Sequence, residues 1–147
     1  AGTEFGINKF DAVTMWFVIE HFSNLKEVLS SVSNILKEGG VFAFSTPSGS
    51  GVSARYNRKS FFESSPSDHY TIWEPEKVSK ILKKFGFSVV KIVSTGHHPE
   101  RFPIVVNNGW TSKEFKFKIF DKISKTLNLG DTFEVYCRKD KTQGEEK

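Results

Sequence analysis

One stretch near the start of the chain constrains the fold more than any other. Residues 10–19, FDAVTMWFVI, form a near-continuous apolar run. Such a run is typical of a strand that is buried on both faces of a sheet. Strands of this kind occur where helices cover the sheet, so the run predicts an α/β layer structure.

The rest of the chain alternates between helix and strand patterns. Apolar residues recur at helical spacing over residues 25–36, Asn24 and Glu27 fit a capping box, and Gly39-Gly40 is expected to end this helix. Further strands are predicted over residues 41–46, 87–94 and 131–138. Further helices are predicted over residues 75–85 and 113–127. The alternation predicts a mostly parallel sheet. Its last strand could run antiparallel, because the connection before that strand is short.

Two segments of the chain show no sustained period. Residues 48–73 carry many serines and several charges, and a loop of this length is usually functional or disordered. Arg55 and Arg58 lie among aromatic residues there and could bind a phosphate-bearing substrate, although a solvated lid is the preferred interpretation. Residues 95–110 are also expected to be irregular.

Composition limits the class of protein. A length of 147 residues is typical of one domain or part of one, and the net charge of +4 is spread along the chain, so a nucleic-acid partner is not expected. One cysteine, Cys137, excludes an internal disulfide. No apolar segment has the length of a membrane span, and the start of the chain shows no signal peptide. We therefore expect a cytoplasmic protein.

The ends of the chain are expected to lie outside the folded unit. Residues 1–9 are interpreted as a lead-in, because residues 2–5, Gly-Thr-Glu-Phe, match what two adjacent restriction sites encode. Residues 140–147 are interpreted as a polar tail.

Several motifs occur together in one order. FDAV, VIEH, LKEGG and STP begin at Phe10, Val18, Leu36 and Ser45. In this order they resemble the second half of a class I S-adenosylmethionine-dependent methyltransferase of the type 11/23 kind. The resemblance covers residues 10–139. It implies a partial Rossmann-like methyltransferase sheet, strands four to seven of seven, with an antiparallel last strand and flanking helices.

The glycine-rich loop of that family is absent. Its first strand ends in a Gly-x-Gly-x-Gly cofactor loop, which does not occur in this sequence. Gly49-Ser50-Gly51 follows a strand, but no convincing helix begins there, so a flexible loop is expected. The chain is therefore expected to be a fragment that binds S-adenosylmethionine weakly or not at all by itself.

The resemblance also implies a set of site residues. Met15, Trp16 and Phe17 would pack against the cofactor, with core packing as the alternative. Glu20 and His21 would line the junction between cofactor and substrate, with satisfaction of local backbone groups as the alternative.

The long loop would add two more residues, because His69 and Tyr70 would lie over the acceptor. Methyltransferases that modify a terminal ribose hydroxyl of small RNAs have a similar pattern, in which two glutamates and two histidines hold a divalent metal. Here Phe17 stands in place of one glutamate. The prediction therefore assigns no metal and favours His21 and His69 as a base or substrate contact. A metal held by the remaining three ligands with water stays open.

The function implied by the resemblance is methyl transfer to an oxygen or nitrogen acceptor of a small molecule or glycan. The alternative is a non-catalytic α/β interaction module that has lost cofactor binding. Because residues 10–19 would form an apolar sheet edge, we also expect a homodimer that uses this edge.

Overall fold

A four-stranded sheet is the central element of the computed structural model, which describes residues 6–141. The strands are β1 (Phe10–Trp16), β2 (Leu36–Pro47), β3 (Phe87–Thr95) and β4 (Thr132–Lys139). Their order is β1-β2-β4-β3, with β1 parallel to β2 and β4 antiparallel to both of its neighbours. The α/β class and the antiparallel last strand are confirmed. β1, β2 and β3 run in one direction and β4 in the other, as predicted. Because β4 lies between β2 and β3, two of the three strand pairings are antiparallel.

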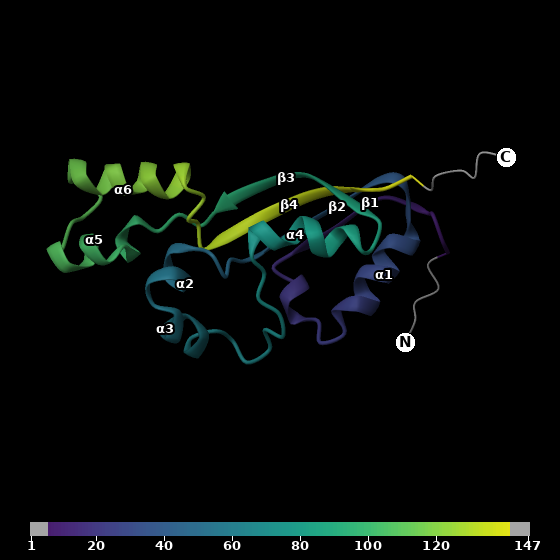
Figure 1. The fold of residues 1–147 in the computed structure, drawn as a ribbon, viewed down its shortest axis with the longest axis horizontal. Coiled ribbons are helices and arrows are strands. Elements are labelled where there is room, and N and C mark those ends of the chain that lie inside the picture. The colour runs from purple at the N-terminus through teal and green to yellow at the C-terminus, as the bar shows by residue number, and fades with distance from the viewer. Residues whose placement is uncertain (1–5, 142–147) are drawn as a thin grey trace.

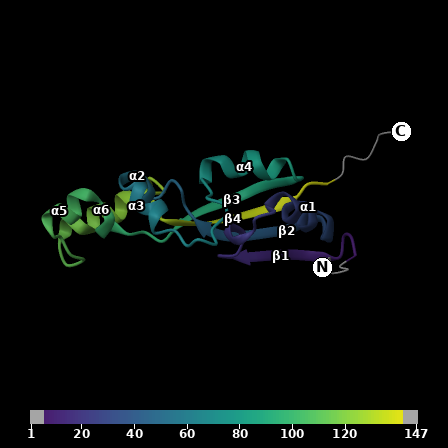
Figure 2. The same ribbon diagram turned by 90° about the horizontal axis from the view of Figure 1, so that it is seen from below.

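Helices cover one face of this sheet. α1 (Leu25–Ile35) connects β1 with β2, and α4 (Pro75–Lys83) precedes β3. Both lie on the same side of the sheet (Figures 1 and 2). Within residues 6–141 no helix lies on the opposite face, which we call the open face.

The short helix η1 (Ile19–His21) follows β1. Most of the remaining helices gather beyond one end of the sheet (Figure 1). Their bounds are α2 (Val52–Tyr56), α3 (Arg58–Glu63), η2 (Pro99–Arg101), α5 (Pro103–Asn108) and α6 (Phe115–Thr126). The two segments expected to be irregular therefore contain three short helices and a 3-10 turn. None of the helices in the described part of the chain is long and apolar enough to cross a membrane.

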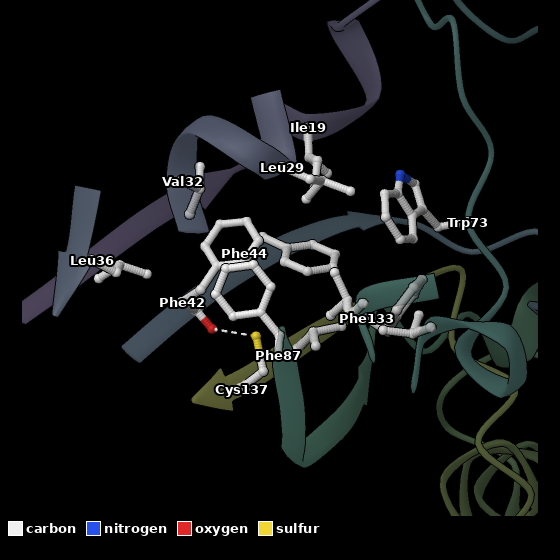
Figure 3. Packing of buried hydrophobic residues seen from close by; sticks show 13 residues of the cluster. Ile19, Leu29, Val32, Leu36, Phe42, Phe44, Trp73, Phe87, Phe133 and Cys137 are labelled. Carbon is white, nitrogen blue, oxygen red and sulfur yellow. Dashed lines mark hydrogen bonds between the residues drawn. The ribbon is translucent and has the colours of Figure 1, made fainter. Parts of the chain in front are cut away.

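The main core follows from strand alternation. Phe42 and Phe44 of β2 pair with Cys137 and Val135 of β4, so these side chains share the face that α1 and α4 cover. All four are at most 1% exposed. Figure 3 shows this cluster and the hydrogen bond from the Cys137 thiol to the Phe42 carbonyl, 3.1 Å long. Burial raises the pKa of the Cys137 thiol to about 12.

A second, smaller core lies among the end helices. Val52, Phe102, Val105 and Leu129 are buried together. The ring centroids of Phe102 and Phe120 lie 5.2 Å apart, which ties α6 to η2. The molecule therefore has a sheet core and a separate helical core.

The first strand differs from the expectation. β1 ends at Trp16 and none of its residues is fully buried, because it is the edge strand of the described sheet and one of its faces is open. Val13 and Met15 still pack against the sheet core. The double-sided burial predicted for residues 10–19 is therefore wrong.

The end of the first helix also differs. α1 ends at Ile35, and Leu36 begins β2. Between the pairs Phe10–Leu36 and Ala12–Val41, β2 contains extra residues, and Gly39 adopts φ 73° in this bulge. Gly39-Gly40 thus shapes a strand instead of ending a helix.

Candidate functional site

The candidate site begins where β1 ends. Phe17 has φ 53°, a left-handed backbone that costs a bulky side chain energy. Its N–H donates to the Ser45 carbonyl and contacts the Ser45 hydroxyl, both at 3.1 Å. These bonds to β2 hold Phe17 in the unfavourable conformation and turn the chain into η1.

The short helix η1 places Glu20 beneath the surface. Glu20 is 1% exposed, and its carboxylate Oε2 has no hydrogen-bond partner in the described structure. The Glu20 carbonyl accepts from the N–H groups of Tyr70 (2.9 Å) and Thr71 (3.2 Å). These backbone hydrogen bonds therefore hold the segment before α4 against η1.

The hydrogen bonds between this segment and η1 bring two histidines together. The ring centroids of His21 and His69 lie 4.7 Å apart in an edge-to-face arrangement. One potential ligand atom from each of Glu20, His21 and His69 lies within 4.8 Å of the other two. The structure thus brings together the three residues that the sequence predicted to meet. We call them the Glu20 cluster.

Neighbouring groups orient both rings. His21 Nδ1 lies 3.1 Å from the Asp68 carboxylate and 3.2 Å from the Asp68 carbonyl. His69 Nδ1 lies 3.5 Å from the Ser65 hydroxyl. Tyr70, the fourth residue predicted here, has an exposed side chain and meets η1 through its backbone.

A cavity of about 670 Å³ opens beside the cluster. That volume is typical of sites for small ligands. His69 belongs to both the cluster and the cavity wall. The other lining groups come mainly from α2, α3 and the η2–α5 region, among them Ser53, Tyr56, Asn57, Ser60, Phe61, Ser64, His98, Arg101 and Asp131.

An ion-pair network forms the far wall of the cavity. Asp131 is almost buried and accepts from the N–H (2.8 Å) and the hydroxyl (2.6 Å) of Ser53 and from Arg101. His98 is paired with Glu100 at 2.7 Å. Sequence reasoning missed Arg101 and Asp131, because 30 positions of the chain separate them. The one signal for Asp131 was the Gly-Asp-Thr-Phe motif, whose last two residues begin β4.

The sequence matches the model of one known protein family. A family model described as a methyltransferase domain, type 23, matches residues 2–92. The chain belongs to this methyltransferase family. No functionally curated protein shows significant sequence similarity to it.

Solved structures share the methyltransferase fold. A methyltransferase in a complex with the Trm112 activator of Haloferax volcanii has a TM-score of 0.63 and 15% identity, over 97% of this chain and 59% of that one. An S-adenosylmethionine-dependent methyltransferase of Archaeoglobus fulgidus has a TM-score of 0.60 and 18% identity, over 90% and 61%.

A third similar structure contains the cofactor. Phosphoethanolamine N-methyltransferase 2 of Haemonchus contortus, in complex with S-adenosyl-L-methionine, has a TM-score of 0.57 and 21% identity, over 94% of this chain and 35% of that one. The chain thus spans about 60% of the first two neighbours' length.

The three residues of this chain that were predicted to contact the cofactor lie in different surroundings. Met15 packs against the sheet core. Trp16 is 45% exposed on the open face, where its ring centroid lies 6.3 Å from that of Tyr136. Phe17 is 52% exposed at the end of β1. Their roles as cofactor contacts stay predictions.

The described residues fit only part of S-adenosylmethionine. Trp16 and Phe17 offer exposed aromatic surface at the end of β1. Gly51, which could have belonged to a phosphate-type cradle, packs tightly instead, because a Cβ there would lie 2.5 Å from Asp131 Oδ1. Gly39 and Gly40 belong to β2. No described glycine therefore supplies the cofactor loop of the family.

Proposed function

We propose that the chain is the C-terminal half of an S-adenosylmethionine-dependent methyltransferase domain that acts on an oxygen or nitrogen acceptor. The observation that carries the proposal is the meeting of the Glu20 cluster and the cavity at His69, directly beyond the ends of β1 and β2. Ligands of open α/β sheets bind at this end of the strands.

The chain's own groups would position the acceptor and manage its proton. Bound S-adenosylmethionine supplies a methyl group on a sulfonium ion. The cavity walls would hold the acceptor in line with that methyl group and exclude water. An imidazole of His21 or His69 would take the proton of a hydroxyl acceptor, which is the usual task of a histidine base near neutral pH.

The cavity lining supports a small-molecule or glycan acceptor. Hydroxyl and amide groups of Asn57, Ser60 and Ser64 offer hydrogen bonds to a hydroxyl-rich ligand, and Tyr56 offers an apolar surface. The guanidinium of Arg101 and the imidazole of His98 in the wall already have carboxylate partners. This pairing favours an uncharged acceptor over a nucleic acid. A cytoplasmic location stays part of the proposal.

A second candidate is a non-catalytic interaction module. The packing of Gly51 against Asp131 favours it, because the described glycines leave no cradle for the cofactor.

Calorimetric titration with S-adenosylmethionine separates the two candidates. We expect this chain alone to bind more weakly than about 1 mM, or about −4 kcal/mol, and a protein that contains the complete domain to bind in the micromolar range. Absence of binding by the complete domain would favour the interaction module. Low-micromolar binding by the isolated chain would show that the fragment part of the proposal is wrong.

A further inference from the structure

We propose that Glu20, His21 and His69 bind a divalent transition-metal ion at the mouth of the cavity. Their potential ligand atoms lie within 4.8 Å of one another. Metal–ligand bonds of about 2.0–2.2 Å hold tetrahedral ligands about 3.4 Å apart. Small side-chain rotations are therefore enough to close the cluster around an ion.

The buried carboxylate is the second observation. Glu20 is 1% exposed, and its Oε2 has no hydrogen-bond partner among the described residues. A buried carboxylate oxygen without a partner is costly, and buried carboxylates are normally paired or bound to a metal. The two backbone bonds from Tyr70 and Thr71 to the Glu20 carbonyl hold it in place. A cation between Glu20 and the imidazoles supplies the missing partner.

The surroundings of the two rings match those of metal-binding histidines. Such a histidine typically donates its other ring N–H to a carboxylate, which fixes the tautomer and the ring orientation. His21 has this arrangement, because its Nδ1 lies 3.1 Å from Asp68 Oδ2. Nε2 is then the nitrogen left to bind the ion. Ser65 occupies the corresponding position beside His69 Nδ1.

The donor set selects the class of metal. Two imidazole nitrogens and one carboxylate suit zinc, cobalt or ferrous iron, whereas magnesium and calcium prefer oxygen ligands. Three protein ligands leave a position open for water or substrate. His69 lines the cavity, so this position is available to a ligand there. If the proposed function is right, an oxygen of the acceptor would occupy it, and the bound ion would then replace a free imidazole in promoting the loss of the acceptor's proton.

Titration of the untagged chain with Co²⁺ tests the site, followed by calorimetry and by visible absorption. We expect one ion per chain and ligand-field absorption bands. His69→Ala should lower the affinity at least about 100-fold, and Asp68→Asn, which removes only the orienting carboxylate, about 10-fold. His98→Ala removes an imidazole outside the cluster and should keep the parent affinity. Circular dichroism establishes that each variant is folded.

Glu20→Gln adds an independent measurement. Without metal this variant should melt at the same temperature as the parent or higher, because it replaces a buried carboxyl group of which one oxygen has no hydrogen-bond partner. It should also lose the rise in melting temperature that Co²⁺ gives the parent.

Two results would overturn the metal site: no Co²⁺ binding by the parent below 1 mM, which is about −4 kcal/mol, or undiminished binding by His69→Ala. Neither experiment uses S-adenosylmethionine. Failure of the metal site therefore leaves methyl transfer to be judged by the cofactor titration. A chain that binds Co²⁺ within a complete domain that never binds S-adenosylmethionine would refute only the proposed function.

Discussion

Phe17 is the residue whose backbone the fold strains most visibly. A left-handed conformation costs an L-residue about 1–2 kcal/mol and costs glycine almost nothing. At φ 53° we therefore expect Phe17→Gly to be more stable than Phe17→Ala by about 1 kcal/mol. Free energies of unfolding in urea measure the difference.

Phe62 provides the matched control for this comparison. It has a similar exposure, 45%, but it lies in α3. Glycine in a helix is less stable than alanine by about 1 kcal/mol, so the order of the two substitutions should reverse there. If the glycine variant were the more stable of the two at both positions, or the less stable at both, the backbone strain at Phe17 would be contradicted.

Cys137 carries a thiol that is buried in the sheet core. Its burial and the rise of its pKa to about 12 keep it protonated in the native state up to strongly alkaline pH. At pH 9, near the ordinary thiol pKa, iodoacetamide should label the urea-unfolded chain rapidly and the native chain at least about 100-fold more slowly. Rapid labelling of the native chain would mean that the sheet core opens readily.

At the scale of elements, Asp131 joins the start of β4 to α2 and η2. Loss of its carboxylate leaves the Ser53 N–H and Arg101 without their acceptor, so Asp131→Ala should lower the unfolding free energy by about 2 kcal/mol. Asp121→Ala, which removes an exposed i,i+4 partner of Lys125 on α6, should cost under about 0.5 kcal/mol. Similar losses of unfolding free energy in both variants would contradict this linking role of Asp131.

The elements also show what the sequence could and could not predict. The strand predicted over residues 131–138 matches β4, because its alternation of apolar and polar residues is typical of a strand with one buried face. The helices α2, α3 and α5 have only five or six residues, too few to establish a 3.6-residue period. The Glu20 cluster was predictable from the resemblance of its motifs to those of known methyltransferases. The Arg101–Asp131 pair was not, because it joins two residues that are far apart in the sequence.

At the scale of the whole molecule, the open face and the β1 edge stay available for a partner. Trp16, Phe17 and Val18 are 41–52% exposed at this edge. We propose a homodimer through residues 10–19, with a mass in light scattering of about twice the 16.7 kDa of one chain. Thr14→Lys should yield monomers, because Thr14 is exposed on β1 and a lysine on an edge strand opposes pairing.

Ile104→Lys is the control for the dimer, because Ile104 is 48% exposed on α5, far from β1 in sequence and beyond the end of the sheet. The mass of this variant should equal that of the parent. A parent that stays monomeric at micromolar concentrations would reject the dimer.

The separation of the sheet core from the helical core gives the molecule a built-in set of optical reporters. Trp73 is 3% exposed within the sheet core, Trp110 packs against the helical core, and Trp16 lies on the open face. These are the three tryptophans of the chain, one for each region. Single-tryptophan forms should therefore emit at different wavelengths, and their melting curves should tell the loss of the cavity wall apart from the loss of the sheet.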